Sequence, residues 1–162
     1  MRFKDLNEAQ LLAVAITAEE EDGHIYRDFA EKLRRDFPAT ADLFIRMSQE
    51  ESTHRHRLID LYRQRFGEHI PLIRRQDVKG FWVPPSWWLV DVIQPEKARE
   101  QAALMELEAR RFYEAAAAKS SDAAVRQLLG DLAQEEIQHE KLASDITEAH
   151  ERSGVLAGEK HV

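Results

Sequence analysis

The amino-acid sequence predicts an all-α protein in which four long helices form a bundle of two antiparallel hairpins joined by a long crossover. Three observations predict this fold. Four long stretches carry apolar residues at helical spacing, and only 6 glycines and 5 prolines interrupt the 162 residues. Short loops separate the stretches within each pair, whereas about 28 residues separate the two pairs. The second pair also repeats the residue pattern of the first.

The first hairpin occupies the N-terminal part of the chain. Its first helix is predicted from Asn7, a residue type that favours the N-cap, to about Asp36, shortly before a proline. Apolar residues recur along it at intervals of three and four. The second helix is predicted from about Thr40 to Phe66, where Gly67 closes it. The loop between these helices is short, so they should pack antiparallel.

The crossover and the second hairpin follow. Residues 67–94 are too many for a tight turn and enough to run the length of a bundle, which returns the chain to its starting end. The third helix is predicted to start at Pro95, a favourable first helical residue, and to reach about Lys119. The fourth is predicted to start after Ser121 and to run to about Arg152.

Length and composition limit the classes of protein to consider. The length suits one domain, expected over residues 1–152, with a C-terminal tail or linker over residues 153–162. The 23 Lys and Arg against 30 Asp and Glu give a net charge of −7, which argues against nucleic-acid binding. No stretch of ~18 apolar residues predicts a membrane span, and the N-terminus lacks the apolar region of a signal peptide.

Cysteine is absent from the chain. Its absence excludes disulfides, thiolate zinc sites, iron–sulfur clusters and a rubredoxin centre within these residues. It fits a reducing compartment, and we expect a cytoplasmic protein.

A hexamer of the form Gln-Glu-Glu-x-x-His occurs twice, starting at Gln49 and at Gln134. Residues three apart share one face of a helix, so Glu51 points with His54, and Glu136 points with His139. In both helices this face also carries the apolar residues, so the four polar groups are expected in the core. Burial of such groups is costly unless something compensates them.

The first and third helices repeat a second pattern. Glu19 is followed seven residues later by Tyr26, and Glu106 by Tyr113, so each pair lies on one buried face. Together with the two hexamers, this sends four glutamates and two histidines toward one axis. Carboxylates can bridge two divalent cations, and each imidazole can give one nitrogen to one cation. This is the ligand set of the di-iron and di-manganese carboxylate bundles.

These motifs resemble the rubrerythrin/erythrin branch of the ferritin-like superfamily, over roughly residues 5–150. Within it, the chain is most similar to the N-terminal ferritin-like (erythrin) domain of the membrane-bound ferritin A family. Relatives fuse that domain to a vacuolar-iron-transporter-like membrane domain. The resemblance implies a ferritin-like four-helix bundle that holds two iron ions. It also implies roles for eight residues: bridging carboxylates Glu51 and Glu136, terminal ligands Glu19, Glu106, His54 and His139, and supporting tyrosines Tyr26 and Tyr113.

The helix 1 ligand has an alternative. Glu20 is 100° around the helix from Glu19 and would replace it if the helix were rotated. The simpler interpretation is that Glu20, Glu21 and Asp22 form a charged surface patch.

Three further glutamates are additional candidates for metal ligation. Rubrerythrins carry an additional glutamate three residues after the first ligand of helix 3, where this chain has Ala109. Glu108 would fill that role only if the helix held a π-type insertion, and otherwise it is a surface charge. Glu50 and Glu135 precede the predicted ligands in each hexamer. They are candidates for outer or entry-path acids, although a solvated flank is the simpler interpretation.

The functional expectation is a di-iron protein that binds Fe(II) and oxidises it with O₂ or H₂O₂, with manganese as the other metal that this ligand set accepts. By resemblance it would be the iron-capturing or sensing domain of an iron-export protein, tethered to a membrane transporter domain. Two alternatives are a rubrerythrin-like peroxide reductase served by a separate electron donor, and a metal-free helical interaction module. Tryptophans in the crossover (Trp82, Trp87 and Trp88) predict a covered apolar surface, as in a homodimer.

Overall fold

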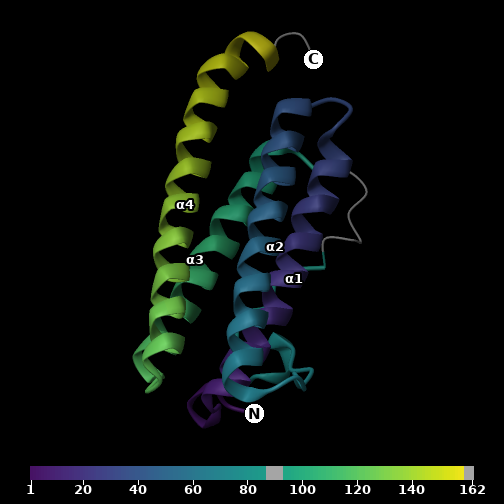
Figure 1. Ribbon diagram of the computed structural model, residues 1–162. Helices are drawn as coiled ribbons and strands as arrows, with labels where there is room; N and C mark the ends of the chain where they lie inside the picture. The colour runs from purple at the N-terminus through teal and green to yellow at the C-terminus, as the bar shows by residue number, and fades with distance from the viewer. Residues whose placement is uncertain (87–92, 159–162) are drawn as a thin grey trace.

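The computed structural model describes the backbone of residues 1–86 and 93–158, and the side chains of residues 1–86 and 93–141. Within these residues the chain forms α-helices and short 3-10 helices and contains no strand, which confirms the all-α class (Figure 1). The elements in chain order are η1 (Phe3–Asp5), α1 (Glu8–Leu33), α2 (Pro38–Phe66), η2 (Arg75–Asp77), α3 (Pro95–Lys119) and α4 (Ala123–Gly158).

The first hairpin starts with the predicted cap. The Asn7 side chain accepts a hydrogen bond from the backbone N–H of Gln10, whose side chain accepts one from the Asn7 N–H, so both groups satisfy free donors of the first turn. Helix α1 ends at Leu33, a little before the predicted end. Helix α2 begins at Pro38, two residues earlier than predicted. Proline both prevents α1 from continuing and fits the first turn of the next helix. Gly67, at φ +93°, closes α2 as predicted.

The second hairpin has the predicted start and a longer end. Helix α3 spans Pro95–Lys119, as the sequence predicted. The Asp122 carboxylate accepts the backbone N–H groups of Ala124 and Val125 and so caps α4. Helix α4 is described to Gly158, beyond the end predicted from the sequence. The division into a domain and a C-terminal tail stays a prediction.

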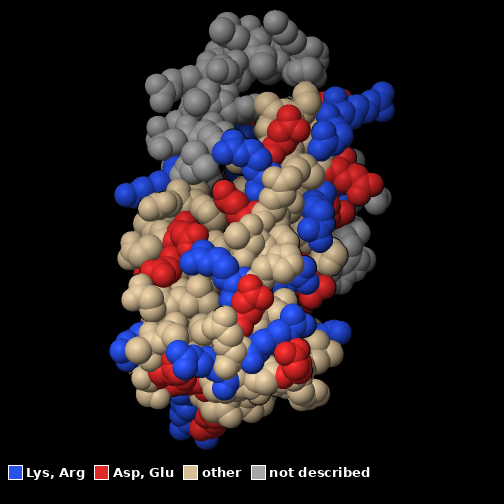
Figure 2. All heavy atoms as spheres, viewed as in Figure 1, with Lys and Arg blue, Asp and Glu red and all other residues tan. Residues whose placement is uncertain are grey.

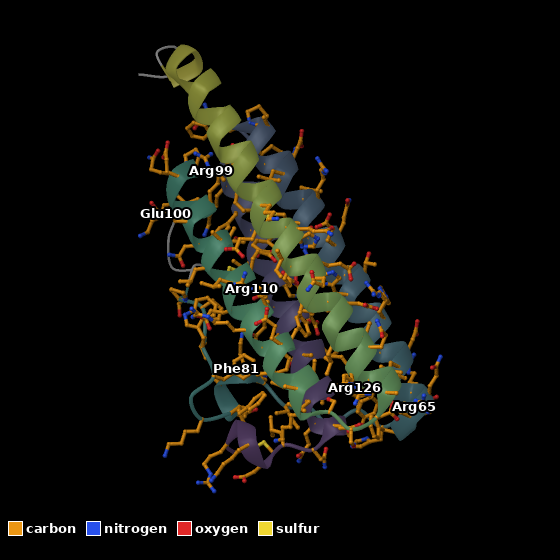
Figure 3. All side chains as sticks on the ribbon, turned by 90° about the vertical axis from the view of Figure 1, so that its left-hand side faces the viewer. Arg65, Phe81, Arg99, Glu100, Arg110 and Arg126 are labelled. Carbon is orange, nitrogen blue, oxygen red and sulfur yellow. The ribbon has the colours of Figure 1, made fainter. Side chains whose placement is uncertain are left out.

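The four helices form the predicted bundle of two hairpins. Helix α1 runs away from the N-terminal end, α2 returns to it, and α3 begins at the far end (Figure 1). Consistent with this, Arg65 near the end of α2 and Arg126 near the start of α4 lie at the same end of the molecule (Figure 3). The crossover therefore spans the length of the bundle, as its number of residues required.

The described part of the crossover packs against the bundle. Ile73 and Val78 are buried in the apolar cluster near the N-terminal end, and Trp82 packs against the cluster at the far end. Arg2 and Lys79 form an isolated bridge that holds the start of the chain against it. Trp87 and Trp88, which the sequence associated with a dimer interface, lie outside the described residues.

The core consists of two apolar clusters. The first contains Leu11, Leu58 and Leu129 near the N-terminal end, and the second contains Phe29, Phe44 and other residues toward the far end. Between them lies a polar layer of buried side chains from all four helices: Glu19, Glu51, His54, Glu106 and Glu136. A bundle that needed only stability would continue its apolar core through this layer, because buried charges are costly without compensation.

The outer surface is charged but mixed. On the face shown in Figure 2, Lys and Arg side chains alternate with Asp and Glu, and neither sign gathers into a continuous patch. In the described part of the chain, none of the helices combines the length and the apolar character that crossing a bilayer requires.

Candidate metal centre

Each of the four helices contributes one carboxylate to the polar layer. Glu19 comes from α1, Glu51 from α2, Glu106 from α3 and Glu136 from α4. Their side chains are 3%, 2%, 1% and 0% exposed, respectively, so none of them is solvated by bulk water. The helical periodicity that put these residues on the apolar stripes is what turns them inward.

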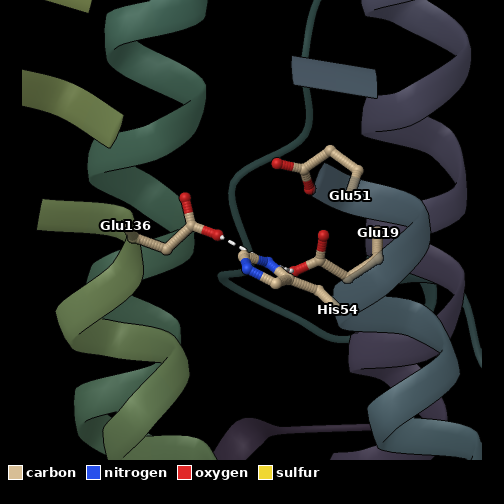
Figure 4. A group of neighbouring side chains, drawn as sticks. All are labelled: Glu19, Glu51, His54 and Glu136. Carbon is tan, nitrogen blue, oxygen red and sulfur yellow. Dashed lines mark ion pairs between the residues drawn. The ribbon is translucent and has the colours of Figure 1, made fainter. Parts of the chain in front are cut away.

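The first group of donors surrounds His54. Its Nδ1 atom lies 3.6 Å from Oε1 of Glu19 and 3.3 Å from Oε1 of Glu136, and Glu51 completes the group (Figure 4). One ligand atom from each of these four residues lies within 4.8 Å of the others. Donors on opposite sides of a divalent cation, each at about 2.1 Å, would be about 4 Å apart, so the group is of the right size for one ion.

The second group surrounds His139 in the same way. Its Nδ1 atom lies 3.7 Å from Oε2 of Glu106 and 3.9 Å from Oε2 of Glu136, and Glu51 again completes a group within 4.8 Å. The rings of His54 and His139 are nearly parallel, at 4°, with their centroids 5.5 Å apart. Glu51 and Glu136 therefore belong to both groups, whereas each histidine belongs to one.

The electrostatics of the layer leave it incomplete without a cation. Burial and the neighbouring charge of Glu19 raise the pKa of Glu51 well above its usual range, because two buried carboxylates cannot both ionise cheaply. Several buried donor and acceptor atoms that face the layer also have no hydrogen-bond partner: Glu19 Oε2, His54 Nδ1, Glu106 Oε2, both Glu136 oxygens and His139 Nδ1. Buried polar atoms are normally paired, so these atoms fit a pair of divalent cations in their donor type and their number.

The two buried tyrosines hold carboxylates of the opposite hairpin. Tyr26 of α1 donates its phenolic hydrogen to Oε1 of Glu106 at 2.8 Å, and Tyr113 of α3 donates to Oε1 of Glu19. Burial, together with the charge of the carboxylate that each contacts, raises the pKa of both phenols well above the usual range, so they stay protonated donors. Each bond fixes one oxygen of a carboxylate and leaves the other turned toward the layer.

Each histidine likewise lies beside a glutamate of the opposite hairpin. Nε2 of His139 lies 2.7 Å from Oε2 of Glu50, and Nε2 of His54 lies 3.8 Å from Oε1 of Glu135. The first glutamate of each hexamer thus lies beside the histidine of the other hexamer. The hydrogen bond from His139 lowers the pKa of Glu50, so this carboxylate stays ionised. Arg57 donates to both oxygens of Glu135, at 2.9 and 2.7 Å, and holds it in place.

All four additional candidates lie outside both donor groups, and Glu20 and Glu108, unlike Glu50 and Glu135, are paired with neither His54 nor His139. Glu20 is exposed and lies near Arg55 and His24, at 3.9 and 4.0 Å, so Glu19 is the residue that α1 turns inward. Glu108 accepts a hydrogen bond from Arg111 at 3.0 Å and lines an outer pocket with Phe81. Helix α3 runs from Pro95 to Lys119 as a regular α-helix, so it has no insertion that would turn Glu108 toward the layer.

The interpretation of Asp22 as part of a surface patch is wrong. Its side chain is buried and accepts a hydrogen bond from Arg75 of the crossover at 2.6 Å. Arg75 also donates to Glu21 at 3.0 Å. Burial raises the pKa of Asp22 to about 7, although Arg75 opposes this shift. The signal for Asp22 was its position three residues after Glu19, on the same helical face. No pattern in the sequence pointed to Arg75.

Comparisons with known proteins agree with the fold. A protein-family model described as rubrerythrin matches residues 10–147. An uncharacterized conserved protein from Magnetospirillum magnetotacticum MS-1 has a similar crystal structure, with a TM-score of 0.73 and 24% sequence identity over 89% of this chain and 95% of that chain. A hypothetical protein from Pyrococcus furiosus is also similar, with a TM-score of 0.71 and 21% identity over 90% of this chain and 91% of that chain. At these identities, both structures support the fold alone. A search of curated proteins finds no match.

Proposed function

The chain belongs to the rubrerythrin family, whose members are di-iron oxidoreductases, and on this premise we propose that it binds two Fe(II) ions in the polar layer and oxidises them. The observation that carries the proposal is the pair of donor groups that share Glu51 and Glu136. Six carboxylate and imidazole side chains converge there, and five of them, all except Glu51, have a buried atom without a hydrogen-bond partner.

The roles of the residues follow from their positions. Glu51 and Glu136 would each offer an oxygen to both ions, because each belongs to both donor groups. Glu19 and His54 would complete one site, and Glu106 with His139 the other. The hydrogen bonds from Tyr26 and Tyr113 keep two of these carboxylates oriented before any metal arrives.

The bound ions would supply the redox chemistry that carboxylates and imidazoles lack. Reduction of one H₂O₂ to two waters takes two protons and two electrons, one electron from each of two ferrous ions. The protein contributes a fixed geometry, negative charge that favours the more highly charged ferric product, and exclusion of bulk water.

The test is an anaerobic titration of the metal-free protein with Fe(II), followed by thermal unfolding. We expect two ions per chain and a rise in Tm of several degrees, since a ligand present at 100 times its Kd stabilises by about 2.7 kcal/mol. The Glu51→Ala/Glu136→Ala variant should lose both ions. A Glu96→Ala/Glu100→Ala variant removes two exposed carboxylates from α3 and should bind as the wild type does.

The metal-free protein gives a second readout of the same titration. Without iron, Glu51→Gln should unfold at a higher temperature than the wild type, because glutamine avoids the cost of burying and protonating a carboxyl group whose pKa is raised, and it opens no cavity. With iron it should unfold at a lower temperature, because a ligand is lost. If Fe(II) leaves the Tm of the wild type unchanged, the chain is a metal-free helical module and the proposed function is wrong.

The oxidant separates two versions of the function. Stopped-flow mixing of the Fe(II)-loaded protein with O₂ or with H₂O₂ ranks them by rate. Faster reaction with O₂ supports a ferroxidase, and much faster reaction with H₂O₂ supports a peroxide reductase that a separate electron donor would return to the ferrous state. The peroxide reductase is tested beside the ferroxidase because the chain belongs to the rubrerythrin family.

The cellular role follows from the resemblance to the membrane-bound ferritin A family. In this proposal the domain lies in the cytoplasm, captures iron for a membrane transporter domain, and acts as a homodimer. Light scattering on the purified chain tests the dimer, which should have twice the mass of one chain. Iron export from cells that express the domain with and without the Glu51→Ala/Glu136→Ala change tests the role in transport.

A further inference from the structure

Helix α1 contains a buried glycine in its interior, where glycine lowers the stability of a helix. Gly23 lies in the interior of α1, where glycine is less favourable than alanine. Its backbone does not require glycine, because the glycines with positive φ among the described residues are Gly67 and Gly80. Close packing does not require it either. A Cβ atom at Gly23 would lie 3.6 Å from Nη1 of Arg27, 3.7 Å from Cβ of Glu51 and 3.8 Å from the Ser48 carbonyl oxygen, which are ordinary contacts.

The space beside Gly23 belongs to a pocket between α1 and α2. The pocket has a volume of about 200 Å³, and its lining includes Glu19, Gly23 and Ser48, all of which are buried. A water molecule occupies about 30 Å³ of liquid, so the pocket has room for several molecules of this size. It reaches the side chain of Glu19, whose Oε2 atom is buried without a hydrogen-bond partner. The pocket therefore leads to one of the predicted ligands of the metal centre.

The outer part of the pocket is more basic than acidic. Two arginines, Arg27 and Arg55, line it against one glutamate, Glu20. Arg27 also lies 2.8 Å from Nδ1 of His24, and its guanidinium can only donate in this contact. The positive charge at this opening does not attract a divalent cation, and it does not hinder the entry of a small neutral molecule.

We propose that this pocket, which we call the α1–α2 channel, is the route by which a small neutral oxidant, O₂ or H₂O₂, reaches the buried carboxylates. Gly23 keeps the channel open, and the lower helix stability of glycine is the cost of that opening. The proposal rests on the proposed function, because it assumes that an oxidant reacts at the centre. It assigns a role to Gly23 and the channel that the metal ligands do not require.

The first test measures access without metal or activity. The chain has no cysteine, so Ser48→Cys places a single thiol on the lining of the channel. Ser120→Cys is the matched control, because Ser48 and Ser120 are 4% and 5% exposed and each donates its hydroxyl to a helix carbonyl, Ser48 within α2 and Ser120 as the C-cap of α3. Methyl methanethiosulfonate should modify the thiol at position 48 of the metal-free protein about tenfold faster than the thiol at position 120.

The second part closes the channel in steps. Gly23→Ala, which fits without a clash, should slow modification at position 48, and Gly23→Leu should reduce it to the rate at position 120. Comparison of the same thiol in different Gly23 backgrounds removes the effect of the local charge on thiol reactivity. Circular dichroism shows whether Gly23→Leu folds, and Gly23→Ala keeps the test decisive if it does not.

The third part measures use of the channel by the oxidant. Gly23→Ala and Gly23→Leu should bind two Fe(II) as the wild type does, yet react with H₂O₂ or O₂ progressively more slowly, by about tenfold for leucine. Equal thiol modification at positions 48 and 120 would overturn the channel. If a substitution at Gly23 slows modification of the thiol at position 48 but leaves the rate of iron oxidation unchanged, the oxidant does not use the channel. If the wild-type protein binds iron without oxidising it, the proposed function is wrong. The thiol experiment still decides whether the channel is open.

Discussion

At the scale of single residues, the exchange of partners between equivalent positions explains why the hexamer and the Glu–Tyr pattern each occur twice. Tyr26 donates to Glu106 and Tyr113 to Glu19, so each hairpin orients a carboxylate of the other. Glu50 likewise lies beside His139. A single copy of either pattern would lack its partner. The duplicated sequence therefore encodes one site with approximate twofold symmetry.

Glu50 is predicted to position His139 for metal binding. Glu50→Gln keeps the size of the side chain but weakens its 2.7 Å contact with Nε2 of His139, so the Nδ1 atom would be held less firmly toward the polar layer. Loss of such an outer partner typically reduces metal affinity by about 10–100-fold. Anaerobic competition for Fe(II) with a chromophoric chelator measures the change.

The control for this prediction is Glu100→Gln, which alters an exposed carboxylate on α3 (Figure 3). It should leave the Kd unchanged. If Glu50→Gln also binds Fe(II) with the wild-type Kd, Glu50 is a solvated flank of the helix, as the simplest interpretation of the sequence had it.

At the scale of secondary-structure elements, the helices depend on polar contacts at their ends and on apolar packing between them. The loop between α3 and α4 is held to the start of α1 by one carboxylate. Oε1 of Glu8 accepts hydrogen bonds from the backbone N–H groups of Ser121 and Asp122 and from the Ser121 hydroxyl, at 2.6, 3.0 and 2.7 Å. This contact joins the two hairpins at the N-terminal end of the bundle.

The Glu8 contact should make part of the stability dependent on pH. The hydrogen bond from the Ser121 hydroxyl, with those from the backbone, lowers the pKa of Glu8 below the ordinary glutamate value of 4.5. A depressed pKa means that the folded state binds this proton less readily than the unfolded state. The stabilisation is therefore present above about pH 4.5 and is lost as the pH falls through the folded-state pKa.

The corresponding experiment compares urea unfolding of the metal-free wild type and Glu8→Gln at pH 7 and at pH 3. The variant should be less stable at pH 7, and the difference should shrink at pH 3, where the wild-type carboxylate is also protonated. Glu100→Gln serves as the exposed control. A difference between wild type and Glu8→Gln that is the same at both pH values would contradict the assignment.

At the scale of the whole molecule, a buried ion pair fixes the crossover to α1, three residues from Glu19 of the polar layer. Arg75 of η2 is 3% exposed and donates to Asp22 of α1 at 2.6 Å. Attraction to Asp22, and then to Glu21, raises the pKa of Arg75 against the effect of burial, so the guanidinium stays charged. The crossover is thereby fixed to the helix that carries Glu19.

Removal of one partner of this buried pair should destabilise the fold strongly. Arg75→Met would leave Asp22 buried without its counter-charge, at a cost of about 3–5 kcal/mol in the free energy of unfolding. The double variant Asp22→Asn/Arg75→Met, which removes both charges, should recover a large part of this loss. Urea unfolding at pH 8 measures both variants. Equal losses in the single and double variants would mean that Arg75 acts through packing and not through its charge.

The arrangement of the bundle was largely predictable from local signals. Asn7, Gly67 and Pro95 marked helix ends by their own chemistry, and the spacing of apolar residues identified four helices. Pro38 was interpreted only as the end of the first helix, although it is also the first residue of α2. The lengths of the loops then left few ways to connect the helices.

The six inward side chains could also be found in the sequence, because periodicity and duplication act on the same residues. The choice between Glu19 and Glu20 could not be made there, since it depends on the rotation of α1 against its neighbours. The burial of Asp22 was missed because three consecutive acidic residues resemble a solvated face, and its partner Arg75 lies in a segment without periodicity.

The sequence by itself therefore determined the four helices, their connection and the set of carboxylates and imidazoles that face the core, because each of these depends on local propensity or on helical spacing. The tertiary structure alone decided which side chains meet. It paired each tyrosine with the glutamate of the other hairpin, Glu50 with His139 and Asp22 with Arg75, and it placed the α1–α2 channel beside Gly23. Contacts between residues far apart in the chain depend on how the helices rotate and pack against one another, and no local pattern records that geometry.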